Sequence, residues 1–310
     1  MIHRSTRRPL AALVTLVASV APLSALPTTP AAAGIVVLLK SGALDAYDRT
    51  AAGFLESCRS GVMPLSLADG DPAALERRVL AARPDAVVAV GLKAALFARD
   101  RLPRLPLVFC VVPNFERFEL AAAWVTGVSS DVPPVSEIDA LRGVAPDVKR
   151  IGLFYGRATG ADLARRARAA ADETGITLIG VPIASLPELP KAARGVVTQV
   201  DALWMPADPT VATPEAFHFL LDLSLEHRKP LLVFSESLVR AGALLAVSPD
   251  YGWMGASAAE AVRRIQSGDR AGDIAVAPLR RTRVILNQAT ARALGRDVPP
   301  EALHSAEVVR

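Results

Sequence analysis

The sequence predicts an α/β protein made of two Rossmann-like lobes with parallel sheets, joined by a multi-stranded hinge. From residue 34 onward, short runs of Val, Ile and Leu alternate with amphipathic helical patterns. That alternation is typical of parallel strands covered on both faces by helices. The chain is also longer than one domain usually is, even without its first 33 residues. Together these observations favour two βαβ lobes in tandem.

Two series of strands are expected, separated by a stretch rich in Gly, Ser and Pro at residues 126–134. The strands of the first series are predicted at 35–39, 62–67, 86–90 and 107–112, and those of the second at 150–155, 177–183, 202–205 and 231–235. Helical periodicity connects them at 43–57, 72–82, 93–100, 135–144, 161–174 and 214–227.

The C-terminal part is too short for a third domain, although it holds strand and helix patterns at 243–247, 254–266 and 283–294. We expect it to cross between the lobes and to complete both. The first lobe is then predicted to comprise residues 34–130 and 238–272, and the second residues 131–237 and 273–310. The crossings, expected near 129–132, 237–240 and 272–275, would form the hinge.

Residues 1–33 have the three-part pattern of a cleavable signal peptide. A basic start with Arg4, Arg7 and Arg8 leads into an apolar stretch that ends in three small residues, Ala31 to Ala33. Prolines in this stretch disfavour a buried helix. We therefore expect export to the periplasm. The Arg7-Arg8 pair leaves a twin-arginine signal open beside the favoured Sec route, and no cysteine near the cleavage point offers a lipid anchor.

Charge and cysteine content exclude several classes of partner. The leader holds three of the 35 Lys and Arg residues and none of the 31 Asp and Glu residues, so the remainder is nearly neutral. A neutral chain gives no electrostatic reason for binding nucleic acid or an anionic membrane.

Cys58 and Cys110 are expected to remain unpaired, because a helix end and a strand interior rarely satisfy disulfide geometry. The four histidines are scattered, so we expect no metal and no cofactor.

Several stretches, in order along nearly the whole mature chain, then carry a resemblance. They are A-L-D-A-Y-D-R-T-A-A-G-F from residue 43, V-T-G-V-S from 125, A-P-D-V-K-R-I-G-L-F-Y from 145, V-D-A-L-W-M-P-A-D from 200, R-A-G-A-L-L-A-V-S-P-D-Y from 240 and N-Q-A-T-A-R-A-L-G from 287. Together they resemble the ABC transporter substrate-binding family that includes bacterial tryptophan and tyrosine binders. The resemblance implies a type I periplasmic-binding-protein fold, capture of a small molecule for an ABC transporter permease, and no catalysis.

Ligand contacts are expected in a cleft at the carboxyl ends of the strands, where loops from both lobes converge. Helix N-termini there suit a ligand carboxylate, and Asp208 or Glu236 suits an ammonium group or sugar hydroxyls. Capping and turn roles are the structural alternatives for Ser41, Ser235 and Asp208. The candidate ligand-binding residues are Ser41, Tyr47, Gly91, Asn114, Tyr155, Asp208, Ser235 and Glu236.

Two departures from the family pattern leave the ligand open. Leu92 stands where a small hydroxyl residue is common, and Pro113-Asn114 replaces the usual Asp-Pro. Both changes remove polar groups expected to hold an amino-acid backbone, so an amino acid is one possibility among small polar solutes. A periplasmic sensing module that feeds a membrane receptor remains an alternative function. A two-lobed enzyme is disfavoured, because the chain lacks the glycine-rich nucleotide motifs and a complete G-x-S-x-G.

Overall fold

The computed structural model describes residues 1–2, 34–120 and 122–309. The predicted signal peptide lies outside the described residues except for its first two. Residues Ala33–Arg310 form one compact unit. Within the described part of the chain, no helix combines the length and the apolar character that a membrane span requires.

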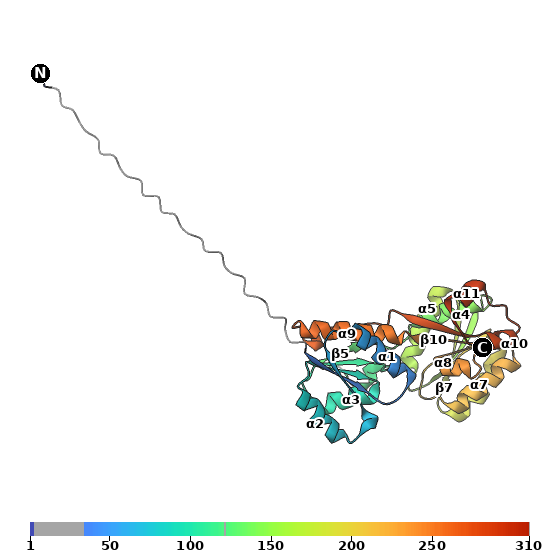
Figure 1. Ribbon diagram of the computed structural model, residues 1–310. Helices are drawn as coiled ribbons and strands as arrows, with labels where there is room; N and C mark the ends of the chain where they lie inside the picture. The colour runs from blue at the N-terminus through green and yellow to red at the C-terminus, as the bar shows by residue number, and fades with distance from the viewer. Residues whose placement is uncertain (3–33, 121, 310) are drawn as a thin grey trace. The chain divides into compact units, whose positions relative to one another are not determined.

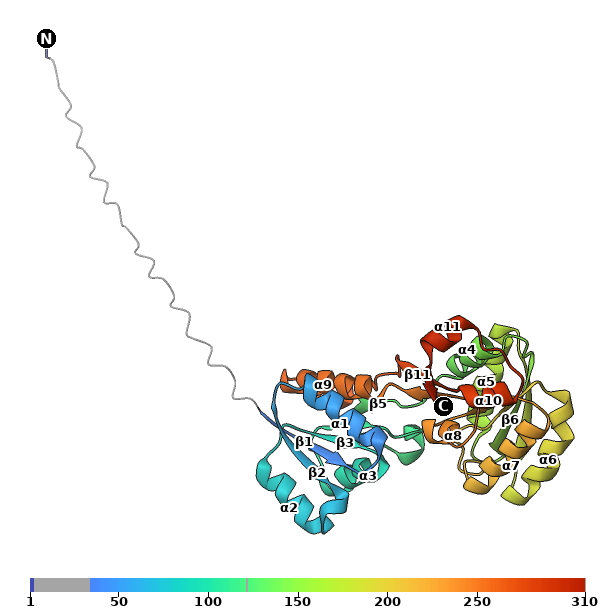
Figure 2. The same cartoon turned by 45° about the vertical axis from the view of Figure 1, so that its right-hand side comes forward.

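The compact unit contains two separate sheets (Figures 1 and 2). The first has the order β2-β1-β3-β4-β5 and is entirely parallel. Its strands are β1 (Ile35–Lys40), β2 (Gly61–Ser66), β3 (Ala86–Val90), β4 (Leu107–Cys110) and β5 (Val125–Val128). This arrangement confirms the predicted parallel sheet of the first lobe.

The second sheet has the order β12-β11-β10-β9-β8-β6-β7, and its only antiparallel pair among the described residues is β10 with β11. Its strands are β6 (Arg150–Gly156), β7 (Thr177–Ile183), β8 (Ala202–Trp204), β9 (Leu231–Val233), β10 (Leu245–Pro249), β11 (Thr282–Asn287) and β12 (Glu307–Val309). The α/β class with mostly parallel strands is therefore as predicted.

Helices cover both faces of each sheet. On the first sheet, α1 (Asp45–Ser57) and α9 (Tyr251–Gln266) pack on one face, and α2 (Pro72–Ala82) and α3 (Leu92–Arg101) on the other. On the second sheet, one face carries α4 (Pro134–Val144), α5 (Ala161–Thr174), α10 (Gln288–Ala293) and α11 (Pro300–Ser305). The other carries α6 (Leu189–Val196), α7 (Pro214–Glu226) and α8 (Glu236–Arg240). Burial on both faces explains why the strands are apolar without alternation.

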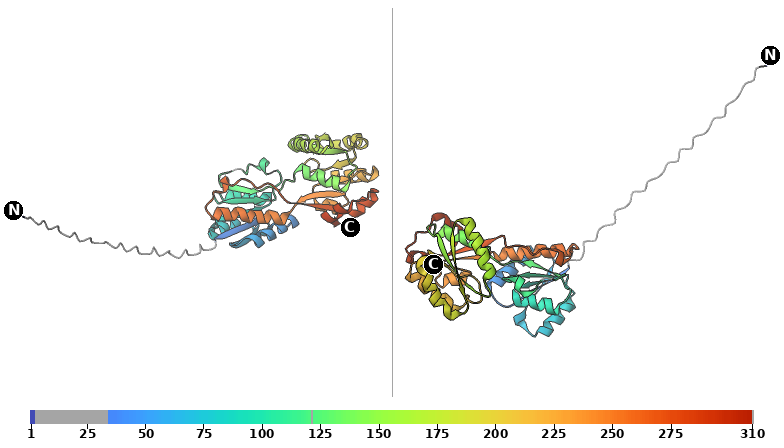
Figure 3. Two further views of the ribbon diagram at one scale, coloured as in Figure 1. Left: turned by 90° about the horizontal axis from the view of Figure 1, so that it is seen from above. Right: turned by 180° about the vertical axis from the view of Figure 1, so that it is seen from behind.

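Helices α1 and α9 are far apart in the sequence but lie side by side (Figure 3). A Cβ atom on Gly255 would come within 2.1 Å of the Thr50 carbonyl oxygen, and one on Gly53 within 2.2 Å of the Gly252 carbonyl oxygen. The two backbones therefore touch where both helices carry glycine. This contact attaches the C-terminal segment to the first lobe.

The chain crosses between the sheets at residues 129–133, at 250 and at 278–281. Ser129 N, in the first crossing, donates to the carbonyl oxygen of Ala277, which directly precedes the third, at 2.9 Å. The second and third are joined by Asp250 N, which donates to the Arg281 carbonyl oxygen at 2.9 Å. The last two crossings differ from the expected 237–240 and 272–275, since β10 joins the second sheet before α9 returns to the first. Strand β10 is buried along its length, and such a strand suits either sheet.

Strands β5 and β12 were not predicted. Residues 126–134 resemble a linker because of their Gly and Pro content, yet β5 pairs with β4 in register. Gly127 is required there because a Cβ atom would lie 2.6 Å from the Phe109 ring. The predicted separation of the two cysteines is confirmed, as Cys58 and Cys110 are both free.

Candidate functional site

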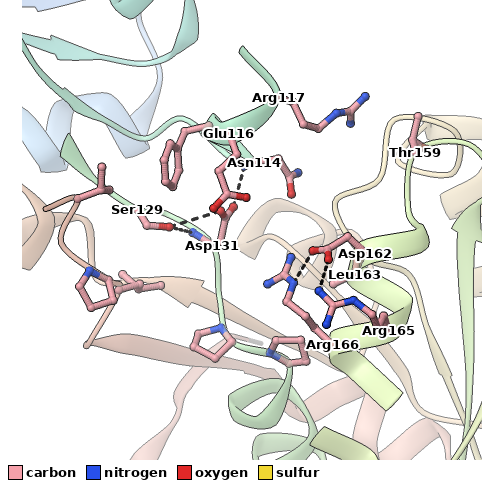
Figure 4. Close-up of a pocket in the computed structure, with 16 residues that line it drawn as sticks. Asn114, Glu116, Arg117, Ser129, Asp131, Thr159, Asp162, Leu163, Arg165 and Arg166 are labelled. Atoms are coloured by element: carbon pink, nitrogen blue, oxygen red, sulfur yellow. Dashed lines mark hydrogen bonds and ion pairs between the residues drawn. The ribbon is translucent and has the colours of Figure 1, made fainter. Parts of the chain in front are cut away.

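Two adjoining cavities lie where carboxyl ends of strands from both sheets meet. The arginine-rich cavity, of about 690 Å³, is lined by residues that include Glu116, Arg117, Asp162, Arg165 and Arg166 (Figure 4). The apolar cavity, of about 270 Å³, is lined mainly by Val111, Pro113, Val132, Pro206, Ala207, Phe234, Val247, Pro249 and Tyr251. Both cavities share Asn114, Asp131, Leu163 and Arg166. Because these four residues line both cavities, they mark the boundary between them, which we call the passage.

Ion pairs organise the second-sheet side of the arginine-rich cavity. Asp162, in the first turn of α5, accepts hydrogen bonds from Arg165 and from Arg166 Nε, the latter at 2.8 Å (Figure 4). The hydrogen bonds from these two guanidinium groups lower the pKa of Asp162. Because Arg166 uses Nε for this contact, its remaining N–H groups can serve a ligand.

Asp131 supplies the opposite charge at the passage. Its Oδ1 atom accepts a hydrogen bond from Asn114 N at 2.8 Å, and its Oδ2 atom lies 3.4 Å from the Ser129 hydroxyl, which donates to it. The departure at Pro113-Asn114 therefore does not leave this edge of the first sheet without an acid. Asp131 comes from the first crossing segment and lies against the loop that lacks the usual aspartate.

The apolar cavity contains one strained backbone position. Val111 has φ +54°, in the left-handed region that a β-branched residue rarely adopts. It follows β4 directly, is 8% exposed and lines the cavity. Strain of this kind persists where the surrounding structure fixes it, and it is frequent at ligand-binding loops. The turn that positions Pro113 and Asn114 begins at this residue.

Two buried polar side chains line the apolar cavity. Glu137 in α4 is 6% exposed, and Trp204 Nε1 donates to its Oε1 atom at 3.2 Å. Burial raises the pKa of Glu137 to about 8. Ser130 is 8% exposed, and its hydroxyl oxygen has no hydrogen-bond partner among the described residues. Apart from the residues shared with the arginine-rich cavity, the polar side chains of the apolar cavity therefore include these two and Ser235.

Of the residues predicted from the sequence, Asn114 and Ser235 line the apolar cavity. Ser235 stands at the N-cap of α8, but its hydroxyl is hydrogen-bonded to the Ser237 hydroxyl at 3.0 Å and caps no backbone amide. Asn114 has φ +50°, which asparagine tolerates better than most residues. These two positions remain candidate ligand contacts.

Ser41, Tyr47 and Gly91 come together at the ends of β1 and β3, away from the lining of both cavities. The Ser41 hydroxyl accepts a hydrogen bond from Ala94 N at 2.9 Å, which caps α3, and it also hydrogen-bonds Tyr47. Gly91 has φ +92°, and a Cβ atom there would lie 2.6 Å from Ser41 Oγ and from Tyr47. The hydrogen bond from Ala94 N thus agrees with the capping role given above as the structural alternative for Ser41.

Asp208 and Tyr155 contact other residues of the second lobe. Asp208 is 3% exposed, and its Oδ1 atom accepts from Gly156 N at 3.0 Å and from Thr210 N at 2.9 Å. Its Oδ2 atom accepts from the Thr159 hydroxyl at 2.6 Å. Tyr155 packs against the core of the second lobe. Neither residue lines the cavities described above. Asp208 joins the loops after β6 and β8.

Glu236 connects the two lobes. Its carboxylate accepts hydrogen bonds from Arg240 at 2.7 and 3.0 Å and lies 3.8 Å from Arg49 Nη2 of α1. The hydrogen bond from Arg240 lowers the pKa of Glu236 more than its other neighbours do. The Glu236 carboxylate therefore pairs with arginine side chains of the protein itself.

Sequence reasoning missed Asp131, Glu137, Arg166 and Tyr251. Asp131 lies in a stretch interpreted as a linker, and Glu137 and Arg166 lie in predicted helices where a charged residue carries no distinctive signal. Tyr251 lies between the strand predicted at 243–247 and the helix predicted at 254–266. Only the polar run from Ser129 to Asp131 next to a predicted crossing was a usable indication. Among the described residues, no group of three or more His, Cys, Asp or Glu side chains could hold a metal ion.

Comparison with known proteins gives a family match. A family model described as ABC transporter substrate binding protein matches residues 66–310, which is well over half of the chain. A tyrosine-binding protein of Clostridioides difficile (strain R20291) is 22% identical over 227 residues, which are 68% of this chain and 63% of that protein. The match thus spans less than two thirds of the length of this curated relative.

Solved structures show the same fold. The ligand-free, open structure of a substrate-binding protein with adhesive properties from Clostridium difficile has a TM-score of 0.73 at 20% identity, covering 89% of this chain and 99% of that one. An ABC domain from Streptococcus pneumonia in complex with L-Trp has a TM-score of 0.64 at 21% identity, with the same coverage.

Proposed function

Since the chain belongs to the family of ABC transporter substrate-binding proteins, we propose that it captures an amino acid with an apolar or aromatic side chain. The observation that carries the proposal is the passage between the cavities. Asp131 and Arg166, of opposite charge, line both cavities there, and the apolar cavity opens beside them.

The charges at the passage fit a zwitterionic head group. The Asp131 carboxylate can accept hydrogen bonds from an α-ammonium group, while the free N–H groups of Arg166 can bind an α-carboxylate. Each charge comes from a different part of the chain, Asp131 from the first crossing and Arg166 from α5. A sugar has no charged groups to pair with Asp131 and Arg166, so these two residues favour an amino acid.

The apolar cavity fits the rest of such a ligand. Its walls include Val132, Phe234 and Tyr251, which can pack against an aromatic or branched side chain. The two relatives named for a ligand, the tyrosine-binding protein and the structure in complex with L-Trp, support a ligand of this class.

The remaining parts of the proposal concern location and partners. The N-terminal pattern favours export to the periplasm, where the loaded protein would deliver its ligand to an ABC transporter permease. The family binds substrates for transport, so we propose that the protein catalyses no reaction.

Thermal-shift measurements on the purified protein test this function. The panel contains L-tyrosine, L-tryptophan, L-phenylalanine and L-leucine, with tyramine and 3-(4-hydroxyphenyl)propionate as controls that lack the carboxylate or the amine. An amino acid at a hundred times its dissociation constant should add about 2.7 kcal/mol of stability. The two controls should add far less.

Sugars and nucleosides complete the panel as other classes of solute. Stabilisation by one of them, with no response to any amino acid, would contradict the proposed ligand class. Equal stabilisation by tyrosine and tyramine would contradict the proposed role of Arg166.

A further inference from the structure

We propose that Ser130 and Glu137 form a buried polar subsite in the apolar cavity that binds a neutral hydrogen-bonding group on the ligand's side chain. A phenolic hydroxyl and a ring N–H are groups of this class. The inference rests on the proposed function, since it assumes that an amino acid occupies the cleft.

Ser130 provides the first observation. Its hydroxyl oxygen is buried without a hydrogen-bond partner among the described residues, and the residue lines the apolar cavity. A buried hydroxyl that forms no hydrogen bond destabilises a protein. A ligand group that bonds to this hydroxyl would remove the penalty in the bound state.

Glu137 provides a second, independent observation. Trp204 Nε1 donates to its Oε1 atom at 3.2 Å. Because burial raises its pKa to about 8, the carboxyl group is largely protonated at neutral pH. A protonated carboxyl group offers both a donor and an acceptor. Together with the Ser130 hydroxyl, it can satisfy either a hydroxyl or an N–H.

The charges around the subsite favour a neutral group. Arg166 lines the same cavity, and its positive charge acts on Glu137. A cationic side chain would be repelled by Arg166, and an anionic one by Asp131. A neutral polar group avoids both repulsions and still finds hydrogen-bond partners.

The position of the subsite matches a side chain rather than a head group. Ser130 and Glu137 line only the apolar cavity, whereas Asp131 and Arg166 line both cavities. With the zwitterionic head at the shared passage, the side chain extends among the apolar walls. The proposed polar pair then lies along this side chain.

Calorimetry with matched ligands tests the subsite. L-tyrosine and L-phenylalanine differ only in the hydroxyl, and L-tryptophan and L-3-benzothienylalanine differ in a ring N–H that sulfur replaces. The wild type should prefer the hydrogen-bonding member of at least one pair by roughly tenfold or more, as for one well-placed hydrogen bond.

The variants assign that preference to the two residues. Ser130→Ala and Glu137→Leu should reduce the preference at least threefold while leaving the affinity for the apolar member within about twofold. Glu137→Gln should retain the preference, because a neutral amide also offers a donor and an acceptor. Ser136→Ala and Asp139→Asn, on the same helix but outside the cavity lining, are the matched controls. Ser130→Ala should fold with an unchanged or higher Tm, since it removes an unpaired hydroxyl.

The outcomes separate this subsite from the proposed function. Equal affinities within both ligand pairs, or equal losses for both members in the Ser130 and Glu137 variants, would overturn the subsite while leaving amino-acid binding intact. Preference for 4-aminomethyl-phenylalanine that Glu137→Gln abolishes would show a cationic subsite and would also overturn it. Absence of binding by every amino acid would instead refute the proposed function itself.

Discussion

Glu137 shows how a single buried acid can link the site to the stability of the protein. The carboxyl group lies beside Trp204 with 6% of the residue exposed, and burial raises its pKa from 4.5 to about 8. Between these pH values the folded protein keeps a proton that the unfolded chain has released. Stability therefore falls as the pH rises through this window, by up to about 1.4 kcal/mol per pH unit.

Glu137→Gln should remove this loss, because an amide does not titrate. Urea unfolding at pH 5, 6, 7 and 8 should show a wild-type free energy of unfolding that decreases relative to that of the variant. Asp139→Asn serves as the control and should follow the wild type. Parallel curves for wild type and Glu137→Gln would show that Glu137 is already ionised in the folded protein.

Asp208 is a predicted site residue that is held by several hydrogen bonds within the protein. Its carboxylate accepts hydrogen bonds from two backbone amides and one hydroxyl of the loops after β6 and β8. Asp208→Ala should therefore lower the free energy of unfolding by about 1.5–3 kcal/mol. Asp222→Asn, at an exposed position, should have little effect. Weaker ligand binding by Asp208→Ala with unchanged stability would instead support the original expectation of a ligand contact.

At the scale of residues, the sequence predicts the loops near the cleft more accurately than it predicts the side chains that line the cleft. Asn114 and Ser235 line the apolar cavity, but Asp208 faces its own loops. An acid that follows a strand gives the same sequence pattern whether its side chain lines the cleft or bonds its own loops. The difference depends on whether neighbouring amides point at the carboxylate, which is a property of tertiary structure.

At the scale of elements, the bounds of several strands and helices were predicted accurately. Strands β3 and β7 and helices α2 and α5 have the predicted bounds. Strand β5 was missed because Gly127, which makes room for Phe109, resembles a turn residue. Strand β10 was placed in the wrong sheet because a short buried strand does not specify its partners.

The contact between α1 and α9 gives a prediction at this scale. Gly255→Ala should lower the free energy of unfolding by about 1–3 kcal/mol, because its Cβ atom would meet backbone atoms of α1. Gly143→Ala is a matched helical control with no atom near its Cβ position, and it should raise stability by about 0.5–1 kcal/mol. Chemical denaturation measures both. Equal changes in the free energy of unfolding for the two variants would mean that α1 and α9 can move apart at little cost in free energy.

At the scale of the whole molecule, the two cavities lie beside segments that cross from one sheet to the other. Residues of the first crossing, Ser130 to Pro133, line the cavities, so closure about the crossings would change the cleft directly. Because a bound ligand can contact both lobes only when they approach, it should shift the population towards a closed state.

Small-angle scattering on the purified protein should then show a smaller radius of gyration when ligand is saturating. Arg166→Met is the control and should need roughly ten- to a hundredfold more ligand to show the same decrease. An unchanged radius of gyration in the wild type at saturation would argue against closure about these crossings.

The central claim is that Asp131 and Arg166 hold the head group of an amino acid at the passage between the two cavities. Isothermal titration calorimetry of L-tyrosine and L-tryptophan against the wild type, Asp131→Asn and Arg166→Met tests it most directly. We expect one-site binding by the wild type and a loss of roughly ten- to a hundredfold in affinity in each variant, the value of a hydrogen bond to a charged group. Wild-type affinity in both variants would contradict the claim, as would the failure of every amino acid to bind the wild type.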